Sequence, residues 1–131
     1  MWCEVVHTEV SGDVMFTLSI SQDNTPVRGN ALASGDDAED KRAEDEIIAR
    51  LQDGDIWAWA FVKVTASVRI RDQVVEGTDA LGACSYRDTE DFISGDGYYQ
   101  DMREEAARQL RLTLEGLVKQ GIAAKELLER I

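Results

Sequence analysis

Several residue types and patterns are scarce in this chain, and each scarcity excludes a class of protein. The 131 residues include one proline, one histidine and two cysteines. Cys3 and Cys84 have neither metal-binding nor redox spacing, which favours a reduced protein. No apolar run approaches the roughly 20 residues of a membrane-spanning helix, and residues 1–4 lack the basic and apolar regions of a signal peptide. We therefore expect a cytoplasmic protein.

Positive charge is also scarce. Lysine and arginine total 14 against 26 aspartates and glutamates, so the formal net charge is −12. Such a chain lacks the positive surface that general nucleic-acid binding requires, and anionic membranes repel it. The excess is concentrated, because residues 36–55 carry net −6 and residues 72–105 carry net −8, whereas residues 56–71 carry net +3. We expect two acidic blocks, mostly in loops and at helix starts.

Alternating hydrophobicity predicts the strands. Residues 5–10 and 14–21 flank a short glycine-containing turn signal and read as a hairpin. Within residues 56–71, apolar residues occupy every even position. This period of two predicts one long strand whose even face is core. Residues 72–79 read as a turn region with short pairing, and residues 81–86 as a return strand.

Helical spacing appears in two places. A first helix begins with Ser34 or Asp36 as its cap, carries acids in its first turns and ends at Gly54. A long amphipathic helix over residues 98–120 shows one apolar stripe with steps of three and four. Gly121 is expected to interrupt it.

These elements define the expected architecture. Residues 87–97 read as an acidic irregular loop, and residues 122–131 as a short terminal helix. The order is β-β-α-β-β-α-α. We expect one α+β domain spanning residues 1–131, in which helices pack on one face of an antiparallel sheet of about four strands.

Few residues suit catalysis or metal binding. His7 is the only histidine, and a Cys84–His7 nucleophile pair lacks support because Cys84 lies inside a strand, where cysteine acts as a small hydrophobe. The acidic loop offers hard oxygen ligands, but their spacing does not match a calcium loop. Its glycines lack the context of a phosphate-binding loop. We expect no enzyme activity, no metal and no cofactor.

The start of the long predicted strand is aromatic. Trp57, Trp59 and Phe61 occupy its odd face, followed by Lys63 and Arg69. Such a face is either a stacking platform for single-stranded nucleic acid or a surface that a helix or a second protomer covers. Cover by a second protomer would make these three aromatic residues an oligomer interface.

Four segments of the second half carry a recognisable pattern, Gly54-Asp55-Ile56-Trp57-Ala58-Trp59, Leu81-Gly82-Ala83-Cys84-Ser85-Tyr86, Asp91-Phe92 and Gly97-Tyr98-Tyr99-Gln100-Asp101-Met102. With this pattern the chain resembles small acidic proteins of bacteriophages and prophages, over roughly residues 54–110. The resemblance transfers no chemistry, but it implies a phage setting and a location in the host cell cytoplasm. It also implies a direction, because small acidic phage proteins without catalytic motifs often counter host defence by binding, and some resemble DNA in charge.

The leading hypothesis is therefore a non-catalytic protein-binding module, an acidic, DNA-mimic-like inhibitor. Its expected partner is a basic surface of a host nucleic-acid-binding defence complex, such as CRISPR or restriction machinery. Contact with nucleic acid itself or with a membrane is not expected. The residues expected to bind the partner are the acidic side chains of both blocks and one tyrosine beside the second: Asp36, Asp37, Glu39, Asp40, Glu44, Asp45, Glu46, Asp88, Glu90, Asp91, Asp96 and Tyr98.

The alternative is a homo-oligomeric structural or accessory phage protein. It would assemble, for example as a homodimer, through the face of Trp57, Trp59 and Phe61.

Overall fold

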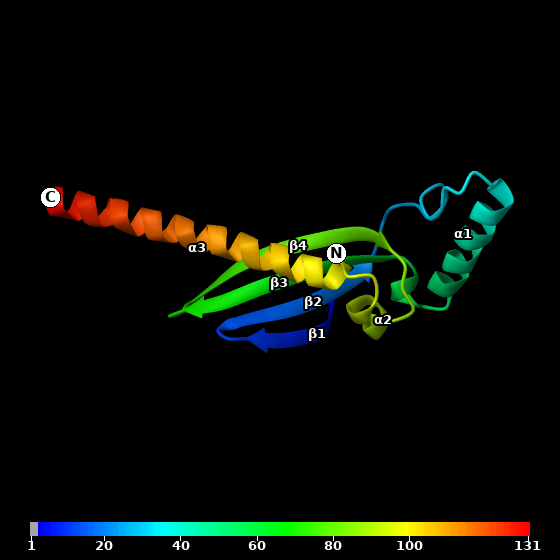
Figure 1. Cartoon of the computed structure of the whole chain (residues 1–131), viewed down its shortest axis with the longest axis horizontal. Coiled ribbons are helices and arrows are strands. Elements are labelled where there is room, and N and C mark those ends of the chain that lie inside the picture. The colour runs from blue at the N-terminus through cyan, green and yellow to red at the C-terminus, as the bar shows by residue number, and fades with distance from the viewer. Residues whose placement is uncertain (1–2) are drawn as a thin grey trace.

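A computed structural model describes residues 3–131, and a four-stranded antiparallel sheet forms its centre (Figure 1). The strands lie in chain order: β1 (Glu4–Ser11), β2 (Val14–Gln22), β3 (Ala60–Ile70) and β4 (Gln73–Cys84). The strands predicted for residues 5–10 and 14–21 are confirmed by β1 and β2. The expected α+β class and four-stranded antiparallel sheet are confirmed as well.

The long strand predicted for residues 56–71 is correct from Ala60 onward and wrong before it. Residues Ile56–Ala58 form a 3-10 helix, η1. The carboxylate of Asp55 caps η1 by accepting a hydrogen bond from the backbone N–H of Trp57 at 3.2 Å. A side-chain cap of this kind offers the backbone an alternative to strand pairing, and an alternating pattern does not reveal it.

The turn region predicted for residues 72–79 is instead part of β4. A tight turn at Arg71, whose φ is +55°, joins β3 to β4. The two strands then pair from Ile70 and Gln73 to Ala60 and Cys84, with one register shift near the end of β4. The expectation failed because this strand contains glycine and acidic residues, which have low β propensity, and their pairing with a central strand overrides that propensity.

The first predicted helix is confirmed as α1 (Asp37–Gln52). Asp36 is its N-cap, with a side chain that accepts hydrogen bonds from the backbone N–H groups of Ala38 and Glu39. Gly54 follows the helix with a φ of +84°, a conformation that favours glycine. Capping chemistry therefore located both ends of this helix correctly.

The predictions for the last helices need correction. A short helix, α2 (Thr89–Ser94), lies within the loop that was expected to be irregular. Beyond it, α3 (Tyr98–Arg130) is one continuous helix and does not break at Gly121. A glycine inside a helix costs only about 1 kcal/mol relative to alanine, so it does not end a helix whose neighbours are strong helix formers. The observed order also contains η1, which was not predicted.

The core lies between α3 and one face of the sheet. Leu18, Val62 and Val64 are fully buried on the sheet side, and Met102 and Ala106 are buried on the α3 side. Most contacts of α3 with the sheet are made to β4 and β3. The predicted packing of helices on one face therefore describes α3, whereas α1 lies beyond the end of the sheet (Figure 1).

A polar network ties α3 to the edge strand β1. The carboxylate of Glu9 lies 2.9 Å from the guanidinium of Arg103 and accepts hydrogen bonds from Tyr99 at 3.1 Å and His7 at 2.8 Å. The guanidinium of Arg103 also lies over the ring of Phe16, 4.5 Å from its centroid. This network holds the first half of α3 in place. Among residues 3–131, no helix combines the length and apolar character needed to cross a lipid bilayer.

Candidate partner-binding surface

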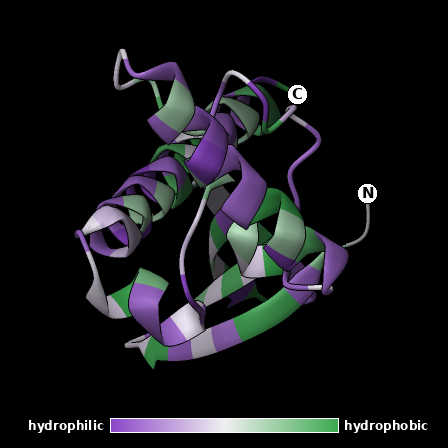
Figure 2. Ribbon diagram, turned by 90° about the vertical axis from the view of Figure 1, so that its right-hand side faces the viewer, coloured by the Kyte–Doolittle hydropathy of each residue, from purple (hydrophilic) through white to green (hydrophobic). Residues whose placement is uncertain are grey.

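One end of the molecule carries most of the net charge. We call residues 25–55, which comprise the loop after β2, α1 and the turn before η1, the acidic arm. They contain nine carboxylates and four basic groups, net −5. Residues 86–101, which we call the acidic corner, contain five carboxylates and one arginine, net −4. Figure 2 faces this end and shows a largely hydrophilic ribbon there.

The acidic arm is only lightly attached to the rest of the chain. The apolar residues of α1, such as Ile47, Ile48 and Leu51, are half-buried, and η1 is its main contact. Arg50 anchors the C-terminal end of the helix by donating hydrogen bonds to the Asp55 carboxylate, at 2.8 Å, and to the backbone carbonyl of Tyr86. The acidic first half of α1 therefore extends away from the sheet (Figure 1).

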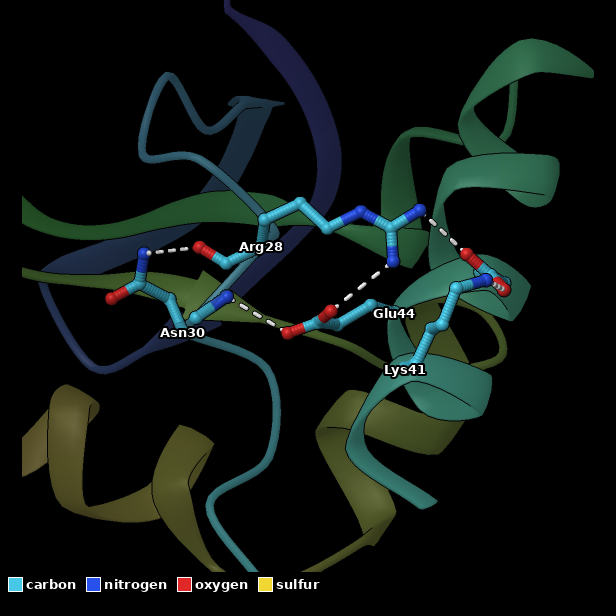
Figure 3. A network of polar contacts seen from close by, with 6 residues as sticks. Arg28, Asn30, Lys41 and Glu44 are labelled. Carbon is cyan, nitrogen blue, oxygen red and sulfur yellow. Dashed lines mark hydrogen bonds and ion pairs between the residues drawn. The ribbon is translucent and has the colours of Figure 1, made fainter. Parts of the chain in front are cut away.

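Glu44 is the one residue of α1 that is buried, and it holds the arm together (Figure 3). Its carboxylate accepts a hydrogen bond from the Arg28 guanidinium at 3.1 Å and another from the backbone N–H of Gly29 at 2.8 Å. Arg28 also pairs with Asp45, which in turn lies 2.8 Å from the ammonium of Lys41. These contacts fix the loop of Arg28 against α1.

The predicted residues of the arm divide into two groups. Asp36, Asp40, Glu44 and Asp45 have partners within the chain, with Asp40 accepting from Ser34. The carboxylates of Asp37, Glu39 and Glu46 form no hydrogen bond or ion pair within residues 3–131, and all three residues are exposed. A hydrogen bond from a neutral donor leaves the charge of a carboxylate in place, so the arm remains strongly negative.

The acidic corner shows the same division. Asp88 caps α2 by accepting from the backbone N–H of Asp91 at 2.9 Å. The Asp91 carboxylate accepts hydrogen bonds from the backbone N–H of Arg87, at 3.0 Å, and from the Arg87 guanidinium. These two contacts lower the pKa of Asp91. Asp96 accepts a hydrogen bond from the Tyr86 hydroxyl at 3.0 Å, and the Glu90 carboxylate has no such contact among the described residues.

The two acidic groups border the same end of the molecule without forming one continuous patch. The C-terminal end of α1 approaches the corner through Arg50 and Tyr86. The start of α1 lies well away from α2 (Figure 1). The predicted binding residues therefore lie in two separate groups, the acidic arm and the acidic corner.

An open pocket of about 330 Å³ lies beside the acidic corner. The last residues of β4 form one wall, and Asp96 and the exposed Tyr98 form the other. The polar side chains of its lining are one carboxylate and the hydroxyls of a serine and two tyrosines. The pocket therefore suits a cationic side chain, which would meet both negative charge and aromatic rings.

A bulge in β4 shapes this pocket. Gly82 and Ala83 lie opposite the single residue Phe61, and Ala83 has a φ of +53°. The buried Asp23 supports this conformation by accepting hydrogen bonds from the backbone N–H groups of Ala83 at 2.8 Å and Thr25 at 2.7 Å. Although burial opposes ionisation, these two bonds lower the pKa of Asp23. Bulges often re-aim side chains next to functional sites.

The geometry does not make Cys84 a nucleophile. Its thiol is buried, and burial together with the charges of Asp23 and Asp96 raises its pKa to about 11. The thiolate population at neutral pH is therefore negligible. His7 belongs to the Glu9 network on β1 and does not contact Cys84. The described residues contain no group of three or more His, Cys, Asp or Glu side chains placed to hold a metal ion.

The three aromatic residues predicted as an oligomer interface do not form one exposed face in the single chain. Trp57 and Trp59 are 7% and 2% exposed within a single chain, and Phe61 is half-buried. The Trp57 indole donates a hydrogen bond to Thr89 at 3.1 Å, and the Trp59 indole donates one to the backbone carbonyl of Thr25 at 2.7 Å. Because η1 breaks the expected strand, the two indoles lie inside the fold and are unavailable to a second protomer.

Sequence reasoning missed two residues that build this end of the molecule. Asp23 and Tyr86 belong to neither predicted block, although Asp23 shapes the bulge and Tyr86 orients Asp96. The local sequence offered one signal for Asp23. An aspartate two residues before a threonine in a loop is typical of a turn that the aspartate side chain stabilises. Its contact with a residue 60 positions away leaves no local signal.

Comparisons of the chain with protein-family models, with curated proteins and with solved structures find no match.

Replacing Glu44 by glutamine is expected to loosen the acidic arm. The variant loses the charge that holds Arg28, and its free energy of unfolding should fall by about 1–2 kcal/mol. Trypsin should cleave faster after Arg28, because its guanidinium is released from α1. The matched control is E46Q, which makes the same chemical change at an exposed side chain of the same helix. Equal cleavage rates in E44Q and E46Q would show that Glu44 does not hold the loop.

Proposed function

We propose that the chain is a non-catalytic module that binds a basic surface of another protein through the acidic arm and the acidic corner. The observation that carries this proposal is the concentration of charge, since these two segments hold net −9 of the total −12. The light attachment of α1 supports it as well, because a helix that extends from the body can reach into a groove. Long-range attraction between such a surface and a basic partner speeds their encounter.

The expected partner is a protein whose basic groove ordinarily holds nucleic acid, such as a host defence complex. The acidic arm and the acidic corner can approach such a groove in place of the phosphate backbone. The pocket of Asp96 and Tyr98 would accept one lysine or arginine of the partner, since a carboxylate beside an aromatic ring favours a cation. The module would inhibit its partner by occupying this groove, which requires no chemical step.

Reversing the exposed charges of the arm tests the proposal. The triple variant D37K/E39K/E46K removes three carboxylates that have no partner within the described chain. The partner is first captured from a bacterial lysate and purified. Its affinity for the variant should be weaker by about tenfold or more at low salt, mainly through slower association. The salt dependence of the association rate should also flatten, because fewer charges remain to be screened.

The matched control is D13K/D72K/E76K, which makes the same change in net charge at exposed residues of the β1–β2 turn and the start of β4. It should bind nearly as well as the wild type, because these residues lie at the opposite end of the sheet. Equal losses in both variants, or binding that ignores salt, would refute the acidic surface. If duplex DNA fails to compete for the captured partner, the groove is not a nucleic-acid site.

A further inference from the structure

The second half of α3 lies outside the fold. The helix contains 33 residues and is therefore about 50 Å long. Its buried residues are Tyr99, Met102, Ala106 and Leu110, all in the first half. Leu114 is half-buried, and every residue beyond it is exposed. Figure 1 shows this part of α3 projecting past the turn between β3 and β4.

The apolar stripe of α3 continues after the sheet has ended. Starting from the buried Leu110, the spacing alternates between four and three residues through Leu114, Leu117, Gly121, Ala124 and Leu128, and it reaches Ile131, the cap residue directly after α3. Leu117, Leu128 and Ile131 are 41%, 73% and 92% exposed. Lys119 and Glu126 lie on the opposite side of the helix, and the exposed Val118, Ile122 and Leu127 lie beside the stripe. An alternation of three and four with charges opposite is typical of helices that pair with another helix.

A projecting helix of this kind is poorly stable alone. Isolated helices shorter than about 12–15 residues are marginal in water, and most helices in proteins depend on packing of their apolar face. Gly116 and Gly121 each add a cost of about 1 kcal/mol relative to alanine. Packing of the stripe against a second helical surface, which the described chain does not supply, would therefore stabilise this part of α3.

We propose that this surface is the same stripe of a second copy, so that the chain forms a homodimer through antiparallel α3 helices. The order of large and small residues is self-complementary. When Leu114 of one copy faces Ile131 of the other, Leu117 faces Leu128 and Gly121 faces Ala124. Large apolar side chains then meet at both ends of the pair. The small residues meet in the middle, where they allow the helices to approach closely.

Charge selects the antiparallel arrangement. Residues 1–105 carry net −14, whereas residues 106–131 carry net +2. Parallel helices would place two strongly negative bodies side by side. Antiparallel helices keep the bodies at opposite ends of the pair, separated by more than the screening length of roughly 8 Å at physiological salt.

The end of the sheet offers the incoming helix a further apolar contact. Ile70 follows the alternation of the buried Val64 and Ala66 along β3, and it is 44% exposed. It lies where the sheet ends beneath α3, which is where the last residues of the second copy would arrive. Dimer formation is independent of the acidic end of the molecule, so it can succeed or fail separately from the proposed function.

Analytical ultracentrifugation of the full chain tests the dimer. The wild type should sediment as a dimer, and L117D/L128D should raise the dissociation constant by about a hundredfold or more, because both changes bury charge in the interface. The matched control is K119E, which makes the same change of −2 in net charge on the charged side of α3 and should remain dimeric. Thermal unfolding of both variants checks that the body still folds.

Disulfide formation tests the orientation in a Cys3→Ser background. An equimolar mixture of the L117C and L128C chains should form a mixed cross-linked dimer, whereas L117C alone should not cross-link. A wild type that is monomeric at every concentration, or a dimer that persists in L117D/L128D, would overturn the proposal. Efficient cross-linking of L117C to itself would overturn the antiparallel arrangement.

Discussion

Replacing Gly77 by alanine is expected to lower the free energy of unfolding by about 3 kcal/mol or more, because it overpacks a closed contact. Gly77 lies in β4 directly beneath α3. A Cβ atom there would lie 2.2 Å from the backbone nitrogen of Leu110 and 2.3 Å from the backbone oxygen of Ala106. Both obstacles are backbone atoms of a helix and cannot rotate aside. Either α3 moves off the sheet or β4 bends, and both expose core side chains.

Thermal and urea denaturation measure this loss, and the melting temperature should fall by roughly 10 °C. The matched control is G116A, which makes the same change on α3 where a Cβ meets nothing within 4 Å. G116A should keep the wild-type melting temperature and increase helicity, since alanine favours a helix by about 1 kcal/mol over glycine. A G77A variant as stable as G116A would mean that α3 does not approach β4 this closely.

Sequence patterns determined the elements wherever a single local rule applied. The hairpin of β1 and β2 followed from alternation and a glycine turn, and both ends of α1 followed from the cap at Asp36 and the glycine at 54. Errors arose where two rules competed. Residues 56–58 alternate like a strand, yet Asp55 caps them into a 3-10 helix. Gly121 resembles a break, but the helix continues because a single glycine costs too little to end it.

The acidic end of the molecule was predictable in charge but not in pairing. Counting carboxylates located the acidic arm, but it assigned Asp72 and Glu76 to the second block, and these residues lie at the opposite end of the sheet. Their partners lie far along the chain, since Arg28 and Glu44 are 16 residues apart, and Asp23 and Ala83 are 60 residues apart. No spacing rule connects residues so distant. Four of the predicted carboxylates (Asp37, Glu39, Glu46 and Glu90) point to a partner more directly than the others, because the chain itself does not engage them.

Replacing Phe92 by alanine is expected to cost about 3–5 kcal/mol of unfolding free energy. Phe92 is fully buried and is the one residue of α2 that is buried in the core. Its ring centroid lies 4.9 Å from that of Tyr86, 5.4 Å from that of Trp57 and 6.2 Å from that of Tyr99. Truncation leaves a cavity among three rings that cannot all collapse into it.

The same substitution connects stability to the candidate binding surface. Tyr86 packs on Phe92 and also orients Asp96, so loss of the ring should release the acidic corner as well as α2. F92L is the matched control, because it keeps most of the volume and should cost about 1.5 kcal/mol or less. Near-ultraviolet circular dichroism measures the packing of the rings, and chemical denaturation measures the cost. If F92A and F92L were equally stable, the aromatic cluster would not be what holds α2 and the corner in place.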